Sequence, residues 1–274
     1  FNIIFTTLVA GIGYLLFTDL FNVSKRWSLF VFIYIAFHPT ITVWSTFINI
    51  KDIFVLMLHA IIIYGTYVIL SGKYFRGFSF ILASSIILGF TRFYVPILFL
   101  VSFVLFFLTF AKKGMSSLKF PVLLVSSLSL IYFYIKKEFY FLSGFNIILE
   151  NISNPIYGSI RFYLTPIPFY SVETAYKFLN YSNLWHWITT PLLIIGKLNF
   201  LHSSLPISRY LIVYFIIFCF FYGSFTILQG PRHRIQLELV IAIFQLSGFY
   251  FVWQHRQDLF NSIKNKLLRW PTND

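Results

Sequence analysis

Residues 53–71 have the sequence IFVLMLHAIIIYGTYVILS, a run of 19 residues without Asp, Glu, Lys or Arg. A helix needs about 20 mostly apolar residues to cross the hydrocarbon core of a bilayer, and the apolar runs of soluble helices are shorter. The run therefore predicts a membrane-spanning helix. Its only histidine, His59, is expected to hydrogen-bond inside a helical bundle rather than face lipid.

The composition of the whole chain repeats this pattern. Of its 274 residues, 58% are hydrophobic and 11% are charged, and the mean hydropathy is +0.80. Soluble domains carry about 25% charged residues. Because so few charges cannot cover a water-facing surface, the composition excludes an ordinary soluble protein and predicts extensive contact with membrane lipids.

Apolar segments recur along the chain and predict an all-α, polytopic transmembrane helical bundle of about 8–9 spans. We expect one transmembrane domain over residues 1–253. Residues 78–90 are short for a full crossing, so with 95–111 they are expected to form one broken helix pair (78–111) around Arg92 and Pro96, because proline interrupts a helix. The expected segments lie at about 1–18, 27–50, 53–71, 78–90, 95–111, 120–135, 185–201, 210–228 and 237–253.

Short basic clusters between these segments predict the orientation. Lysine and arginine favour cytoplasmic loops. If the C-terminal tail is cytoplasmic, alternation of the spans places most other basic clusters on the same side. The net charge of +13 is then explained by topology and lipid headgroups, and nucleic acid is not expected as a partner. The clusters comprise Lys25, Arg26, Lys73, Arg76, Lys112, Lys113, Lys119, Arg209, Arg256, Lys264, Lys266 and Arg269.

Two regions are expected not to span the membrane. The tail, residues 254–274, places apolar side chains along one stripe among basic residues, which predicts a cytoplasmic amphipathic helix on anionic lipid. A helix in solvent is the alternative. Residues 136–184 combine short apolar pieces with prolines, and we expect them to form interfacial helices and ordered loop packed over the outer face of the bundle.

Charged residues on the expected outer side come from four distant parts of the chain. Arginine side chains match phosphate oxygens in pairs, so cations beside an apolar bundle favour a phosphate or pyrophosphate headgroup. The alternative is that these residues extend to the membrane surface or form internal ion pairs, such as Lys51 with Glu238. The residues are Lys51, Asp52, Arg92, Arg161, Arg232, His233, Arg234 and Glu238.

Four short segments carry a resemblance to a class of membrane proteins. In chain order they are WSTFINIKD at 44–52, RFYVP at 92–96, PIPF at 166–169 and RHRIQ at 232–236. Over about residues 40–250 the chain resembles the multispanning proteins of bacterial cell-surface polysaccharide assembly, which include GT-C-type glycosyltransferases and O-antigen-polymerase-like proteins. The resemblance implies a polyprenyl-phosphate- or diphosphate-linked sugar handled at the outer face of the bacterial inner membrane.

The resemblance also implies roles for individual residues. Arg92, Arg232 and Arg234 would bind the donor phosphates, with His233 beside them, because a leaving phosphate needs cationic stabilisation. Asp52 would be the general base for an acceptor hydroxyl. Lys51 would adjust the strength of Asp52 as a base and would contribute to phosphate binding.

The chain departs from the GT-C pattern in its first outer loop, where those enzymes usually carry a catalytic acid. Asp19 falls on the cytoplasmic side of the expected topology. Three alternatives remain: the catalytic part precedes Phe1 in a longer protein, Asp52 has another role, or the protein is not a transferase. The non-enzymatic alternatives are a hydrophobic subunit of an energy-transducing membrane complex, with membrane partners, and a transporter built on interrupted helices.

The sequence contains few signals for other kinds of catalytic or cofactor site. No HExxH, CxxC, Walker A or GxSxG motif occurs. A haem site would need a second buried histidine besides His59, which the pattern does not indicate, so neither a cofactor nor a metal is expected. Cys219 lies in an apolar run and is expected to be a buried, inert thiol.

Overall fold

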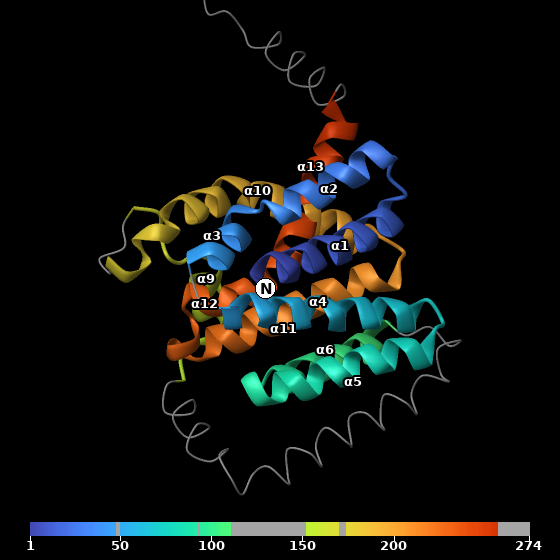
Figure 1. Ribbon diagram of the computed structural model, residues 1–274, viewed down its shortest axis with the longest axis horizontal. Coiled ribbons are helices and arrows are strands. Elements are labelled where there is room, and N and C mark those ends of the chain that lie inside the picture. The colour runs from blue at the N-terminus through green and yellow to red at the C-terminus, as the bar shows by residue number, and fades with distance from the viewer. Residues whose placement is uncertain (48–49, 93, 111–151, 170–173, 257–274) are drawn as a thin grey trace, which may run out of the picture.

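The computed structural model describes residues 1–47, 50–92, 94–110, 152–169 and 174–256 (Figure 1). Within these ranges every regular element is a helix. The α-helices are α1 (Asn2–Phe21), α2 (Lys25–Ala36), α3 (Pro39–Phe47), α4 (Ile50–Leu70), α5 (Tyr74–Thr91), α6 (Val95–Phe110), α9 (Pro155–Leu164), α10 (Asn180–His202), α11 (Pro206–Ser224), α12 (Pro231–Arg234) and α13 (Glu238–Gln254). The 3-10 helices are η3 (Thr174–Leu179), η4 (Thr226–Leu228) and η5 (Ile235–Leu237).

Five helical segments of the described chain are long and apolar enough to cross a bilayer. They are α1, α4, α5, α11 and the continuous run 231–254 formed by α12, η5 and α13. The pair α2 and α3 would make a sixth, bent by 43°. The length and composition of these helices are those of an all-helical integral membrane protein, which confirms the predicted class.

Three details of the predicted segments need correction. Residues 27–50 do not form one straight helix, because Pro39 begins α3 and the residue before a proline avoids helical geometry, so α2 ends at Ala36. Residues 78–90 are not too short, since α5 has 18 residues. Helix α10, which contains the predicted segment 185–201, is not among the candidate spans; the described residues give five or six, which does not confirm the predicted 8–9, and the predicted segment 120–135 lies outside them.

The break predicted near Arg92 is present. Helix α5 ends at Thr91, and α6 begins at Val95. The two helices fold back beside each other as a hairpin (Figure 1). Of the expected outer region 136–184, the described part forms α9, η3 and the start of α10, and α9 packs along α11. The amphipathic tail lies outside the described residues beyond Arg256.

Helix α13 is the centre of the bundle. Every side chain from Glu238 to Gly248 is buried, and α13 contacts α1, α2, α4 and α10. A helix that is apolar on all sides is expected in the interior. The polar side chains within this stretch must therefore find hydrogen-bond partners inside the protein.

Glycines allow α10 and α13 to pack closely. A Cβ added to Gly248 would meet the carbonyl oxygen of Leu192, and one added to Gly196 would meet that of Phe244, both far inside van der Waals contact. Small residues at such crossings permit backbones to approach within membranes. The close approach places the polar side chains of α10 beside those of α13.

Substituting Gly248 by alanine is expected to push α10 and α13 apart, because the methyl group would overlap a backbone carbonyl that cannot rotate away. Overpacking of this kind destabilises by about 1–3 kcal/mol. The measurement is the thermal midpoint of the purified protein in detergent. Gly11→Ala is the matched control, since a Cβ there meets nothing within 4 Å, and a midpoint no lower for Gly248→Ala than for this control would contradict the packing.

The turns separate into two groups at opposite ends of the bundle. Those at 22–24, 71–73 and 203–205 lie together at one end (right in Figure 1). The turn after α5, the start of α4 and the segment leading into α12 lie at the other end. The basic clusters after α1 and α4 are thus distant from Arg92 and Arg232. The orientation of the two ends across a membrane stays a prediction.

Candidate functional site

Four residues predicted from distant parts of the sequence make direct contact, and we call Asp52, Arg92, Arg232 and His233 the arginine cluster. The Asp52 carboxylate accepts a hydrogen bond from Arg92 Nη2 at 3.1 Å. Arg232 Nε lies 3.2 Å from Oδ1 and 3.0 Å from Oδ2 of the same carboxylate. Arg92 Nη1 lies 2.8 Å from His233 Nε2 and donates more weakly to Tyr94 at 3.3 Å.

Local structure fixes each member of the cluster. Asp52 occupies the first turn of α4, where a negative charge is favoured by the helix dipole. Arg92 directly follows α5, and its backbone N–H donates to Leu88 at 2.7 Å, so its position is set by the end of that helix. Arg232 and His233 belong to α12, a single turn that begins at Pro231.

The electrostatic balance of the cluster is positive. Asp52 is 1% exposed and neutralises only one of the two guanidinium groups. Burial lowers the pKa of Arg92, but Tyr94, Tyr222 and Asp52 together raise it by more, so Arg92 stays charged. Because a guanidinium group only donates, Nε2 of His233 must accept, and this imidazole is neutral.

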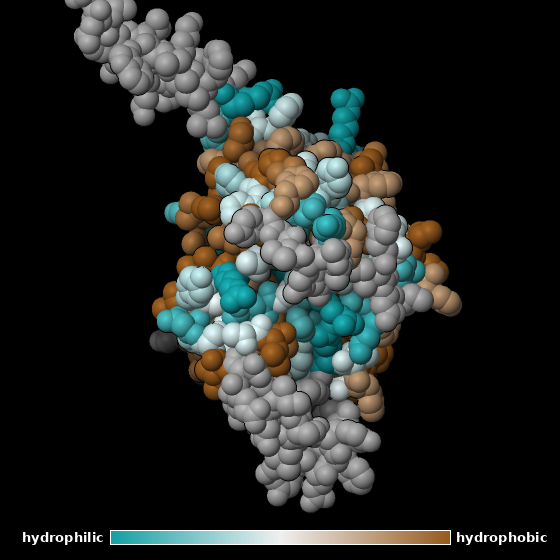
Figure 2. Space-filling model, turned by 90° about the vertical axis from the view of Figure 1, so that its left-hand side faces the viewer, coloured by the Kyte–Doolittle hydropathy of each residue, from teal (hydrophilic) through white to brown (hydrophobic). Residues whose placement is uncertain are grey.

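The cluster reaches the surface through Arg232. Its side chain is 45% exposed, whereas that of Arg92 is 12% exposed. Figure 2 views this end of the bundle and shows hydrophilic side chains gathered between apolar ones. Lys51, next to Asp52 in the chain, is exposed. It makes no ion pair among the described residues, so the pairing of Lys51 with Glu238, given above as an example of the alternative, is absent there.

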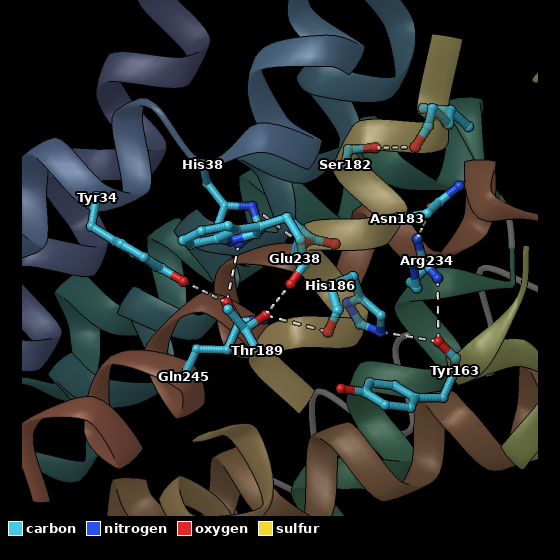
Figure 3. Close-up of polar contacts among 12 residues, drawn as sticks. Tyr34, His38, Tyr163, Ser182, Asn183, His186, Thr189, Arg234, Glu238 and Gln245 are labelled. Carbon is cyan, nitrogen blue, oxygen red and sulfur yellow. Dashed lines mark hydrogen bonds and ion pairs between the residues drawn. The ribbon is translucent and has the colours of Figure 1, made fainter. Parts of the chain in front are cut away.

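Arg234 lies apart from the cluster, although only one residue, His233, separates it from Arg232. It is 2% exposed, and its guanidinium group donates to the carbonyl oxygens of Tyr163 at 3.2 Å and Thr165 at 2.7 Å and to Asn183 Oδ1 at 2.7 Å (Figure 3). These bonds join α12 to the end of α9 and to α10. Arg234 therefore holds the position of α12, and its terminal nitrogens face protein rather than an open surface.

A second group of polar side chains is buried deeper, and we call it the buried polar network (Figure 3). Tyr34 donates to Gln245 Oε1 at 2.8 Å, and His38 Nε2 lies 3.1 Å from the same oxygen. His38 Nδ1 lies 3.4 Å from Glu238 Oε1, and both side chains are 0% exposed. The network also includes Asn183, His186, Thr189 and Arg234.

This network is not predicted from the sequence. Only His59 is expected to be a buried histidine, but His38 and His186 are fully buried as well. His59 itself contacts Tyr214 at 2.7 Å, as expected for a histidine bonded inside the bundle. Glu238 was grouped with the outer charges, yet it begins the most buried helix. The available signal was a glutamate directly followed by an unbroken apolar run.

An apolar hollow lies between α4, α5, α6 and α11. It is lined mainly by hydrophobic side chains from these four helices, and Pro96, one turn from Arg92 along the chain, is among them. The lining includes Ile62, Phe78, Ile81, Pro96, Phe99 and Tyr210. Metal binding finds no support in the described part of the chain, where no three His, Cys, Asp or Glu side chains gather.

No protein-family model, curated protein or solved structure matches this chain. The described fold defines the class, an all-helical integral membrane protein with two polar centres. The arginine cluster and the buried polar network are therefore the features of the molecule that bear on its function.

Proposed function

We propose that the chain binds a polyprenyl-phosphate- or diphosphate-linked sugar at the arginine cluster and acts as a membrane glycosyltransferase or polymerase-like protein. The observation that carries the proposal is the convergence of Arg92 and Arg232 on the single carboxylate of Asp52. Two cations around one anion leave a net positive charge beside an apolar bundle. An amphiphile with an anionic headgroup complements that arrangement.

The free end of Arg232 supports phosphate binding. This side chain uses only Nε on Asp52, and its two terminal nitrogens make no hydrogen bond to any described residue. They form a planar donor pair that matches two phosphate oxygens. Lys51 directly precedes Asp52 in the sequence, and its exposed side chain supplies a further positive charge. Arg234 contributes by holding α12 in place.

Asp52 becomes available as a base if the phosphate displaces it from Arg232. Oδ2 contacts Arg232 alone, whereas Oδ1 is also held by Arg92. A phosphate that binds the terminal nitrogens of Arg232 and draws its Nε away from Asp52 would free Oδ2, while Arg92 keeps the carboxylate in position. The freed oxygen would accept the proton of an acceptor hydroxyl as that hydroxyl attacks the sugar and the lipid phosphate leaves.

The hydrocarbon part of the ligand needs an apolar surface near the headgroup. The hollow lined by Pro96, Phe99 and Ile81 lies between α4, α5, α6 and α11, and Pro96 is four residues from Arg92 along the chain. We propose that the hydrocarbon chain of the ligand lies along these helices, which favours a lipid-linked phosphate over a water-soluble one.

The experiment that tests the proposal separates binding from transfer with Asp52→Asn. Because the amide no longer competes for Arg232, the variant is expected to bind a polyprenyl phosphate at least as tightly as the native chain. It is expected to transfer sugar at least a hundredfold more slowly, since an amide cannot accept the proton. The measurements are equilibrium binding in detergent and sugar transfer from a polyprenyl-diphosphate donor.

Asp19→Asn is the control, because it removes a carboxylate that is bonded to Tyr67 at the far end of the bundle. Native transfer by Asp52→Asn would remove Asp52 from the reaction. Failure of the native chain to bind the lipid phosphate would reject the proposed function as a whole.

One observation favours a transporter as the second candidate. Interrupted helices form the substrate sites of many transporters. The pair α2 and α3 is bent by 43° at His38–Pro39, and the hairpin of α5 and α6 turns at Arg92. Each interruption thus carries a charged or titratable residue. Movement of a polyprenyl phosphate across vesicles containing the purified chain, without sugar transfer, would favour this candidate.

A further inference from the structure

The hydrogen bonds of the buried polar network determine which atoms carry hydrogen, and Thr189 is the first residue whose hydrogen position is fixed. Its hydroxyl group donates to the carbonyl oxygen of Trp185 at 2.8 Å, so its oxygen accepts from Gln245 Nε2 at 2.7 Å. The amide of Gln245 is thereby oriented with its oxygen toward Tyr34 and His38. An amide oxygen can only accept hydrogen bonds. Nε2 of His38, 3.1 Å away, must therefore carry a proton.

The other nitrogen of His38 faces Glu238. With a proton on Nε2, a neutral imidazole presents a lone pair at Nδ1. This lone pair lies 3.4 Å from Glu238 Oε1, and neither side chain is exposed to solvent. A lone pair facing an ionised carboxylate repels it, and burial strengthens the repulsion. The contact is attractive only if a proton resides on one of the two atoms.

We propose that His38 and Glu238 form a proton-binding site inside the bundle, which holds one exchangeable proton between Nδ1 of the imidazole and the carboxylate. The site is independent of the arginine cluster and of the proposed headgroup ligand. In one form the imidazole is charged and the carboxylate is ionised. In the other form both groups are neutral. Either form satisfies the contact.

The surroundings of the pair are compatible with proton binding. Arg234 of α12 carries a positive charge but makes no ion pair with Glu238, because it donates to backbone carbonyls and to Asn183. The other titratable groups that interact electrostatically with the pair or with Arg234 are Tyr34 of α2, Tyr163 of α9 and His186 of α10. Within the described chain, Arg234 is thus the one permanent charge beside the pair.

Unpaired polar atoms around the pair indicate how a proton reaches it. The hydroxyl group of Thr40 in α3 also interacts with the Glu238 carboxylate. Nδ1 of His186, Nδ2 of Asn183 and Nε of Arg234 are buried and have no hydrogen-bond partner among the described residues. Buried polar groups are nearly always paired, with water if not with protein. Donors and acceptors are mixed here, which suits water molecules that relay a proton between α3, α10 and α13.

Loss of the proton has a structural consequence. It would leave an ionised carboxylate facing the lone pair of His38, and both side chains are buried. His38 lies at the bend between α2 and α3, whereas Glu238 begins α13, directly after the segment that carries Arg232 and His233. Release of the proton is therefore expected to separate the bend from α13. The site would link proton binding to the relative position of these helices.

Nuclear magnetic resonance of the full chain in lipid nanodiscs tests the proposal. Histidine is labelled with ¹⁵N in the ring and glutamate with ¹³C in the carboxyl group, and His38→Gln and Glu238→Gln assign the two signals. At neutral pH we expect a proton on either His38 Nδ1 or the Glu238 carboxyl group. Raising the pH should shift both signals at one common midpoint, because a single proton leaves the pair.

The controls distinguish the pair from ordinary titration. In Glu238→Gln, His38 should be a neutral imidazole protonated at Nε2, and the shared step should vanish. His202→Gln, which removes an exposed histidine at the end of α10, should leave the step unchanged. If either network variant fails to fold, the native spectrum still decides, with its signals assigned by sequential correlation. An unprotonated Nδ1 of His38 together with an ionised Glu238 at neutral pH would overturn the proposal.

Discussion

Replacing Arg234 by alanine is expected to lower the stability of the protein by about 3–5 kcal/mol. The substitution removes three hydrogen bonds and leaves the carbonyl oxygen of Thr165 and the side-chain oxygen of Asn183 without their donor, whereas the carbonyl oxygen of Tyr163 keeps its bond to His186 Nε2 at 3.1 Å. Each buried acceptor left unpaired costs about 1–3 kcal/mol. The expected loss corresponds to a fall of about 6–20 °C in the thermal midpoint for a chain of this size.

The lysine variant refines this prediction. Arg234→Lys keeps the charge but lacks the planar fork that reaches two carbonyls and an amide together, so we expect an intermediate midpoint. Arg161→Ala is the matched control, because Arg161 is exposed on α9 and its removal should change the midpoint little. Should Arg234→Ala be as stable as the native chain while losing lipid-phosphate binding, Arg234 would belong to the ligand site, as the sequence analysis expected.

The fold class followed from the sequence because membrane spans depend on local composition alone. The runs that form α1, α4, α11 and α13 are each long and poor in charge, so each is visible without knowledge of its neighbours. The bend at His38 was missed because the apolar pattern continues across it. Pro96 indicates a break because a charged residue, Arg92, stands nearby, whereas Pro39 has no charged neighbour within the apolar run.

The arginine cluster was predictable for a different reason. Charges placed by alternation on one side of a membrane must share that side, so Asp52, Arg92 and Arg232 could be grouped without any contact information. The same argument cannot say which way a side chain points. Arg232 and Arg234 are adjacent in the pattern, but a single helical turn directs one toward Asp52 and the other toward the end of α9. The rotation of α12 is set by tertiary packing.

The buried polar network could not be predicted from the sequence, because none of its residues taken singly gives a recognisable signal. His38 and Gln245 come from opposite ends of the chain, and Thr189 meets Gln245 where Gly196 and Gly248 allow α10 to approach α13 closely. Sequence separation between the partners exceeds 200 residues for His38 and Gln245. No local pattern indicates such a contact, whereas membrane spans and charge alternation are local patterns.

Replacing Arg232 by alanine is expected to weaken the binding of a polyprenyl phosphate about ten- to a hundredfold. Hydrogen bonds to charged groups contribute about 1.5–3 kcal/mol, and about 1.4 kcal/mol corresponds to a factor of ten in affinity. The side chain is half-exposed, and Asp52 keeps its bond to Arg92, so the folded bundle should lose less than about 1 kcal/mol. The two effects are measured on one preparation, by equilibrium binding and by the thermal midpoint in detergent.

Arg76→Ala is the control for net charge, because Arg76 is exposed on α5 at the opposite end of the bundle. It should leave the affinity unchanged. Arg232→Lys should restore part of the affinity, since an ammonium group supplies charge without the paired donors. Equal affinities for the Arg232→Ala and Arg76→Ala variants would mean that the phosphate responds only to overall charge, and the arginine cluster would then be an internal ion pair between α4, α12 and the end of α5.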